Sequence, residues 1–240
     1  MQQQIETGEP NKPVSDNQAP VARHPTGAIP WNYDRAEIIA DGVIHSLGIS
    51  LGLGAASTLI VLATYSTTPI RPGIIAVYAL CLLTMLGMSA AYNLWPLSPQ
   101  KWLFRRFDQS AIYLLIAATY TPFLSQLNDS KLSTCLLVAL WSSAVVGIAV
   151  RLVFPGRFDT FSVVLYVAMG WSGIIAYDNA RASLPVSILA FIAVGGLLYT
   201  IGIIFHLWEN LRFQNAIWHG FVLMGAGCHF TAVLDLVIRL

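Results

Sequence analysis

The stretch "IIAVYALCLLTMLGMSAAYNL", residues 74–94, contains no charged side chain and is long enough, at about 20 residues, to cross the ~30 Å hydrocarbon core of a bilayer as a helix. It therefore predicts a membrane-spanning helix. Its last part is unusual, because Ser89 and Asn93 lie one helical turn apart and so share one face of that helix. A polar face inside a membrane usually marks a packing contact, a site or a path.

The same apolar pattern recurs along the chain and predicts seven membrane-spanning helices. Short joints separate the windows, so residues 33–240 are expected to form one all-α integral membrane domain, a seven-helix bundle. Transmembrane β-strands would instead be short and alternating. The predicted spans are Val43–Thr64, Ile74–Leu94, Ser110–Leu127, Leu132–Phe154, Phe161–Tyr177, Leu184–Trp208 and Ala216–Ile238.

The composition agrees with a chain that is surrounded mostly by lipid. Hydrophobic residues make up 56% of its 240 residues and charged residues 10%, whereas a soluble domain carries roughly 25% charged residues. The formal net charge of +1 gives no reason to expect nucleic acid as a partner. Membrane lipids are the expected partners, and the sequence indicates neither a soluble partner nor an oligomeric state. The cysteines are few and far apart within apolar windows, which argues against a disulfide framework.

Residues 1–32 differ from the rest of the chain. They are rich in Gln, Pro, Asn and Asp and contain no apolar core. This composition predicts a disordered polar tail and argues against a cleaved signal peptide. The first span is then expected to direct insertion into the cell membrane, which the chain crosses several times.

The distribution of basic residues predicts the orientation, because cytoplasmic segments carry an excess of Lys and Arg. If the amino terminus is cytoplasmic, nine basic residues lie inside and four outside, and the carboxyl terminus lies outside. The inside set is Lys12, Arg23, Arg35, Lys101, Arg105, Arg106, Arg151, Arg157 and Arg212, and the outside set is Arg71, Lys131, Arg181 and Arg239.

With this orientation, polar side chains from several predicted spans fall in the cytoplasmic half of the membrane. Such residues usually mark a functional cavity, and the four expected to line it are Glu37, Asp41, His45 and His206. The other polar residues at this depth are Ser89, Asn93, Asp108, Asn215 and His219. Each residue alone also has a structural interpretation. Glu37 and Asp41 could pair with nearby arginines, and Asp108 could pair with Arg105 or Arg106.

Five motifs at these positions resemble the haemolysin III family, within the progestin and adipoQ receptor superfamily. They are "EIIADGVIHSLG" from Glu37, "SAAYN" from Ser89, "FDQSAIYLLIAATYTPF" from Phe107, "GGLLYTIGIIFH" from Gly195 and "NAIWHGFVLMGAGCHF" from Asn215. The resemblance covers almost everything from Glu37 to the end of the chain. It rests on the ordered set, since each motif alone is weak.

The resemblance implies a seven-helix bundle with zinc in its cytoplasmic half. In the family pattern, the second helix ends Ser-x-x-x-His, the third opens with Asp, and the seventh starts His-x-x-x-His. Ser89, Asp108 and His219 match this pattern, and in an enzyme Ser89 and Asp108 would be the catalytic residues, with Asp108 near a metal-bound water. The other two ligand positions hold Asn93 and Asn215.

These two asparagines change the expected chemistry. Zinc prefers imidazole, thiolate and carboxylate ligands, whereas an amide oxygen suits harder cations. One hypothesis is that Ser89, Asn93, Asp108, Asn215 and His219 form a hydrogen-bonded network without metal, because an amide both donates and accepts. The other is a rearranged metal site that includes His45 or His206, which lie at the right depth.

Three functions remain open on the sequence alone. The resemblance favours a non-catalytic membrane protein that senses or adjusts the bilayer. The second is a zinc-dependent membrane hydrolase of lipid amides, in which a metal-activated water attacks the carbonyl. The missing histidines count against this hydrolase. The third is a pore, for which the sequence offers little support because no ladder of charged residues crosses the whole membrane.

Overall fold

The computed structural model describes residues 33–65, 70–154, 156–208 and 210–239, together with two short strands, β1 (Arg23–His24) and β2 (Gly27–Ala28), which pair antiparallel. The predicted disorder of residues 1–32 otherwise lies outside these ranges. The described core of the chain is helical. Its elements are α1 (Arg35–Tyr65), α2 (Pro72–Leu94), α3 (Pro99–Leu124), α4 (Ser130–Val153), α5 (Asp159–Trp171), the 3-10 helix η1 (Ser172–Ala176), α6 (Tyr177–Ser183), α7 (Val186–Leu207) and α8 (Gln214–Arg239).

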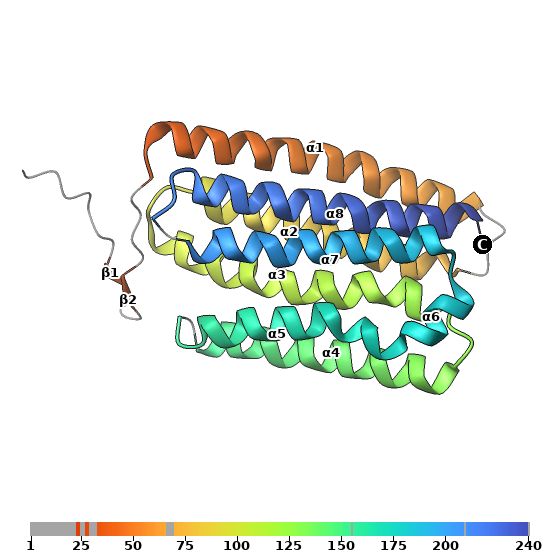
Figure 1. The fold of residues 1–240 in the computed structure, drawn as a ribbon. Coiled ribbons are helices and arrows are strands. Elements are labelled where there is room, and N and C mark those ends of the chain that lie inside the picture. The colour runs from red at the N-terminus through yellow and green to blue at the C-terminus, as the bar shows by residue number, and fades with distance from the viewer. Residues whose placement is uncertain are drawn as a thin grey trace, which may run out of the picture.

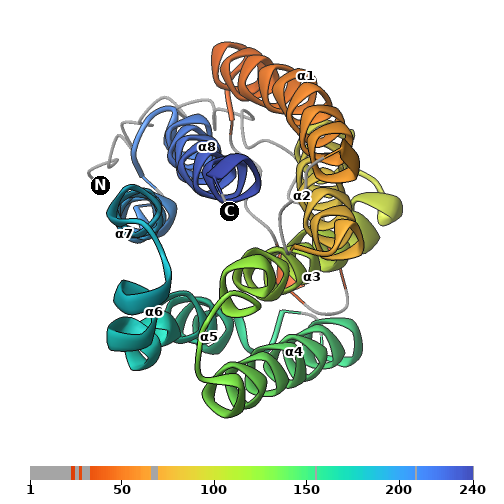
Figure 2. The same ribbon diagram turned by 90° about the vertical axis from the view of Figure 1, so that its right-hand side faces the viewer.

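The long helices run side by side as a bundle (Figure 1). Viewed along the bundle, consecutive helices are neighbours, and α8 lies beside both α7 and α1 (Figure 2). The chain therefore returns to its first helix, and α1 packs against α2 on one side and α8 on the other. This closure brings the start of α1, the end of α2 and the start of α8 to the same end of the bundle (Figure 1).

Six helical segments within the described residues are long and apolar enough to cross a membrane: α1, α2, α4, the α5–α6 segment Asp159–Ser183, α7 and α8. Large apolar side chains on their outward faces are exposed in the isolated chain, as expected for surfaces that contact lipid. The remaining long helix, α3, has 26 residues, which corresponds to about 39 Å at 1.5 Å per residue. Its first turns carry Lys101, Arg105 and Arg106, which lower its hydropathy.

Two expected joints are helical, which corrects the sequence interpretation. The sequence predicts residues 95–108 as a joint between two spans, but α3 begins at Pro99, where proline is favoured because the first helical N–H needs no partner. Residues 178–183 were also expected to be a joint, but they belong to α6. The span predicted as Phe161–Tyr177 changes to the 3-10 helix η1 at Ser172. A hydropathy pattern identifies the residues that contact lipid. It therefore cannot show that a polar stretch next to a span, such as the start of α3, is also helical.

Glycines bring the helices close together at two contacts. A Cβ added to Gly52 of α1 would clash with the Leu86 side chain of α2. A Cβ added to Gly195 of α7 would clash with the His229 imidazole of α8 and lie 3.1 Å from the Gly225 carbonyl oxygen. Small residues at such contacts allow backbones to approach closely in membranes. They fix α1 on α2 and α7 on α8.

Candidate functional site

The start of α1 is defined by a reciprocal cap. The Asp34 N–H donates to Glu37 Oε2 at 2.8 Å, and the Glu37 N–H donates to Asp34 Oδ1 at 2.9 Å. This pattern satisfies two backbone donors that a helix end leaves free. The bond from the Glu37 N–H also holds the pKa of Asp34 below its ordinary value. The cap fixes where the helix begins, and hence which face carries Asp41 and His45 one and two turns later.

The same Glu37 side chain positions the start of α8. Its Oε1 accepts the Phe213 N–H at 2.8 Å. Phe213 has a φ of 59°, in the left-handed region that most side chains avoid. Next to it, Gln214 Nε2 donates to the His206 carbonyl oxygen at 2.8 Å, which ties α8 to the end of α7. These contacts direct Asn215 and His219 toward α1.

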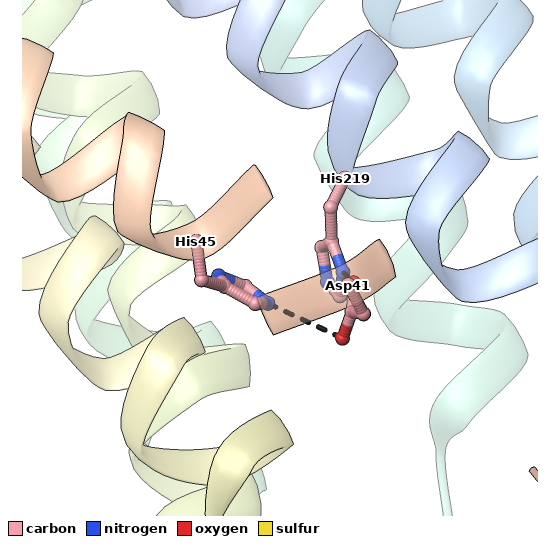
Figure 3. A group of neighbouring side chains, drawn as sticks. All are labelled: Asp41, His45 and His219. Carbon is pink, nitrogen blue, oxygen red and sulfur yellow. Dashed lines mark hydrogen bonds and ion pairs between the residues drawn. The ribbon is translucent and has the colours of Figure 1, made fainter. Parts of the chain in front are cut away.

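Asp41 is the centre of a buried group of polar side chains at this end of the bundle. Its Oδ1 lies 2.6 Å from His219 Nδ1, and its Oδ2 accepts from Asn215 Nδ2 at 3.0 Å. Its Oδ2 also lies 3.5 Å from His45 Nε2, one turn farther along α1 (Figure 3). The side chains of Asp41, His45 and His219 are 8%, 5% and 9% exposed. One carboxylate thus joins α1 to α8.

Helix α2 supplies the other side of this group. Asn93 Oδ1 accepts from Asn215 Nδ2 at 3.0 Å, and Asn93 Nδ2 lies 3.5 Å from His219 Nε2. The same Nδ2 donates to the Ser89 carbonyl oxygen at 2.9 Å, along the face that the sequence predicted. We call Asp41, His45, Ser89, Asn93, Asn215 and His219 the Asp41 cluster. It connects three helices through side chains alone.

A lysine closes the end of α2 next to the cluster. Lys101 Nζ donates to the carbonyl oxygens of Tyr92, Asn93 and Trp95 at 2.7, 3.3 and 2.8 Å. The last carbonyls of a helix lack partners within the helix, so Lys101 satisfies them from the first turn of α3. The amide side chain of Asn93 is thereby held on a fixed backbone.

The other residues singled out in the sequence lie at different places. Asp108 lies near Ser89 and close enough to His219 and His45 to interact with them electrostatically. Glu37 forms the helix-start contacts described above. The ring of His206 packs against Trp218, with 4.9 Å between ring centroids, and His206 does not belong to the group of three close metal-ligand side chains. The hydrogen-bonded network thus includes Asp41, which the sequence indicated only as a residue lining a cavity.

A second group of charged side chains lies at the same end, between α3, α4 and α5. Asp159 accepts from Arg105 Nη2 at 2.9 Å and also pairs with Arg151 Nη1. The Arg151 side chain is 3% exposed and that of Asp159 is 44% exposed. We call these three residues the arginine cluster. The sequence suggested Asp108 as the partner of Arg105, but its ion pair in the structure is with Asp159 on α5.

The zinc that the resemblance implies can be tested against the donor atoms. Asn93 and Asn215 bond to each other and to neighbouring side chains, and amides are poor zinc ligands. Asp41, His45 and His219 instead offer one carboxylate and two imidazoles, whose donor atoms all lie within 4.8 Å of one another. Two ligands of one tetrahedral zinc ion are about 3.3–3.6 Å apart at bond lengths of 2.0–2.2 Å. The 3.5 Å between His45 Nε2 and Asp41 Oδ2 fits this spacing, whereas the 2.6 Å between Asp41 Oδ1 and His219 Nδ1 is a direct hydrogen-bond distance that an ion would have to widen.

The chain is similar to known proteins over a range that includes the residues of the Asp41 cluster. Residues 36–230 match the family described as Haemolysin-III related. The chain is 34% identical over 203 residues to the hemolysin-3 homolog of Bacillus subtilis (strain 168), a match that spans 85% of this chain and 95% of that protein. It is 36% identical over 202 residues to hemolysin-3 of Bacillus cereus, spanning 84% and 92%. The human monocyte to macrophage differentiation factor is 27% identical over 137 residues, spanning 57% and 56%.

Proposed function

The chain belongs to the haemolysin-III-related family of membrane proteins, and on this basis we propose that it senses or modulates the state of the membrane through the Asp41 cluster. The observation that carries the proposal is the closed set of hydrogen bonds from Asp41 and Asn93 to Asn215 and His219. This set couples α1, α2 and α8 at one end of the bundle. A change in how these helices pack must break or rearrange it.

Helix α1 supports the proposal because it faces both the cluster and the lipid. Asp41 and His45 are buried on one face, and Gly48 and Gly52 continue that face along the helix. Val43 and Leu47 on the opposite face are 61% and 50% exposed. A change in lipid packing or thickness acts on the exposed face, and a stiff helix transmits the resulting tilt or shift to the cluster.

The proposed topology has seven spans, with α3 as the third, an amino terminus in the cytoplasm and the carboxyl terminus outside. Its support is the length of α3, its place beside the other long helices (Figure 1), and the excess of basic residues at the ends assigned to the cytoplasm. Cysteine labelling of intact cells tests it. A cysteine placed at residue 129 should react with an impermeant reagent and one at residue 97 should not, and the reverse result contradicts the topology.

The functional test is complementation of a strain that lacks the gene. Membrane order is measured with a fluorescent lipid probe after a temperature shift. The wild-type protein should restore the response, whereas Asp41→Asn should not, because the bonds with His219 and Asn215 use both carboxylate oxygens and an amide replaces one of them with an NH2 donor. Asp235→Asn is the matched control, since Asp235 lies at the other end of α8 and accepts from Ser187 Oγ at 2.7 Å. Equal complementation by both variants, at equal protein levels in the membrane, contradicts the proposal.

A second candidate function is metal-dependent hydrolysis of a lipid amide. The observation that favours it is the approach of Asp41, His45 and His219, with Asp108 near Ser89 on the neighbouring helices. A zinc ion held there would lower the pKa of a bound water and make it nucleophilic. Release of fatty acid from ceramide by the purified protein, lost on chelation and restored by zinc, would replace the sensing proposal with this one.

A further inference from the structure

We infer that Asp41, His45 and His219 bind a divalent transition-metal ion of the zinc class, so that this chain carries a metal site built from α1 and α8. The family pattern takes its zinc ligands from the end of α2 and the start of α8. Asp41 and His45 of α1 are not ligands in that pattern. The inference rests on the proposed function in one respect: both place the functional site at the Asp41 cluster.

The first argument is an unsatisfied atom. His45 is 6% exposed, and among the residues that the structure describes its Nε2 makes no hydrogen bond, only a long ion-pair contact with Asp41. This nitrogen points toward Asp41 Oδ2, at a separation of 3.5 Å (Figure 3). A buried polar atom without a partner costs about 1–3 kcal/mol. A metal ion between the two side chains would satisfy both.

The second argument is the choice and placement of the donors. Zinc-class ions prefer imidazole and carboxylate together, and a site with three protein ligands leaves a fourth position for water. The three donor atoms lie within 4.8 Å of one another. The rings of His45 and His219 are tilted by 56°, with centroids 4.4 Å apart, so they are not stacked face to face. Small movements of the side chains would bring the three atoms to one ion.

The two asparagines then gain a role that differs from metal binding. Asn215 Nδ2 donates to Asp41 Oδ2 at 3.0 Å, and its partner Asn93 fixes the amide through Oδ1. Hydrogen bonds of this kind orient a ligating carboxylate, and losing them typically weakens metal binding 10–100-fold. Asp108 adds a carboxyl group from the neighbouring helix α3 near Ser89.

The competing interpretation is a network that needs no metal. The 2.6 Å contact between Asp41 Oδ1 and His219 Nδ1 and the amide bonds of Asn93 and Asn215 already satisfy most of the cluster. They leave His45 Nε2 without a hydrogen bond and with only its 3.5 Å contact to Asp41 Oδ2. This atom therefore distinguishes the two interpretations, and His45 is the residue on which the experiment turns.

The test uses the full-length chain, purified in detergent with a tag that contains no histidine. The protein is treated with a chelator, loaded with Zn²⁺ or Co²⁺, passed over a desalting column and analysed for metal. We expect one equivalent of metal per chain and a visible Co²⁺ spectrum of the intense, four-coordinate type. Absence of retained metal, or only the weak spectrum of six-coordinate Co²⁺, overturns the inference without the use of any variant.

Variants then locate the ion. His45→Gln and His219→Gln should each lose the retained metal, whereas Asn215→Ala should bind it with 10–100-fold weaker affinity. His206→Gln and His229→Gln are matched controls, because each alters a histidine outside the three-residue group, and both should keep one equivalent. Retention by His45→Gln would assign the metal elsewhere and overturn the inference. Size-exclusion profiles show whether each variant is folded. If one variant misfolds, the Co²⁺ spectrum of the wild type still tests the inference.

The metal-binding test and the complementation test can fail independently of each other. A wild-type protein that restores the membrane response but retains no metal overturns only the metal site. A protein that binds one equivalent but does not restore the response overturns only the proposed function.

Discussion

The Asp41 cluster and the arginine cluster lie at the same end of the bundle, and each has one aspartate between two basic side chains. In the first, the partners are His45 and His219, and all three side chains are less than a tenth exposed. In the second, Arg105 and Arg151 pair with Asp159, whose side chain is 44% exposed. The two groups differ in the chemistry of the basic partners: a histidine can lose its charge, whereas an arginine cannot.

This difference separates a structural ion pair from an adaptable site. An arginine remains charged in proteins and offers only donors, so it always requires an anionic or acceptor partner. A histidine can be neutral, can donate or accept, and can bind a metal. The arginine cluster is therefore expected to hold α3, α4 and α5 together permanently, whereas the Asp41 cluster can rearrange. Four predictions test this contrast, from the largest expected effect to the smallest.

Asp159→Ala should cause the largest loss of stability, because it leaves the buried guanidinium of Arg151 with its charge uncompensated. Removing one partner of a buried ion pair costs about 3–5 kcal/mol, and because Asp159 is 44% exposed we expect a loss at the lower end of this range. Thermal unfolding in detergent measures the loss. The double variant Arg151→Met/Asp159→Ala should recover most of it, because the buried charge is then absent. A double variant as unstable as the single one would contradict this explanation.

Asp41→Ala should cost less, about 1–3 kcal/mol, because His219 and Asn215 lose hydrogen bonds to Asp41, whereas no permanently charged guanidinium is left buried without its partner. The same unfolding measurement gives the value. A loss as large as that of Asp159→Ala would show that the carboxylate matters as much beside two histidines as it does beside two arginines. The contrast between the two clusters would then fail.

Phe213→Ala should be less stable than Phe213→Gly by about 1–2 kcal/mol, because residue 213 adopts a left-handed conformation that only glycine tolerates without strain. Both variants remove the same ring, so their comparison isolates the backbone. Melting temperatures in detergent provide the test. Equal values would mean that the contact between the Phe213 N–H and Glu37 does not require this conformation.

Arg212→Ala should leave the melting temperature unchanged within experimental error. Its Nη2 lies 3.2 Å from Asp34 Oδ2, but the Arg212 side chain is 68% exposed, and surface ion pairs contribute little. It therefore serves as a baseline for the buried pairs. A clear loss of stability would show that charge alone, without burial, matters at this end of the bundle.

The helices themselves followed from the sequence, because long apolar windows report contact with lipid directly. The shared face of Ser89 and Asn93 also followed, since it depends only on helical periodicity. The central position of Asp41 did not, because it depends on how α1 packs against α8. No pattern within a single helix encodes that packing.

The partner of Arg105 shows the same limit. Asp108, three residues away, is the nearest acid in the sequence, whereas Asp159 reaches Arg105 only through the contact between α3 and α5. The start of α3 was missed for a different reason, since Lys101, Arg105 and Arg106 interrupt the apolar pattern without interrupting the helix. Local periodicity predicts elements and faces, and tertiary packing decides which polar groups meet.

The reach of Lys101 back to the end of α2 has a consequence for where that end can lie. A helix end normally depends on water to satisfy its last carbonyls, and burying them without partners costs several kcal/mol each. Lys101 replaces that water for Tyr92, Asn93 and Trp95. The turn that carries Asn93 can therefore keep its shape in surroundings from which solvent is excluded.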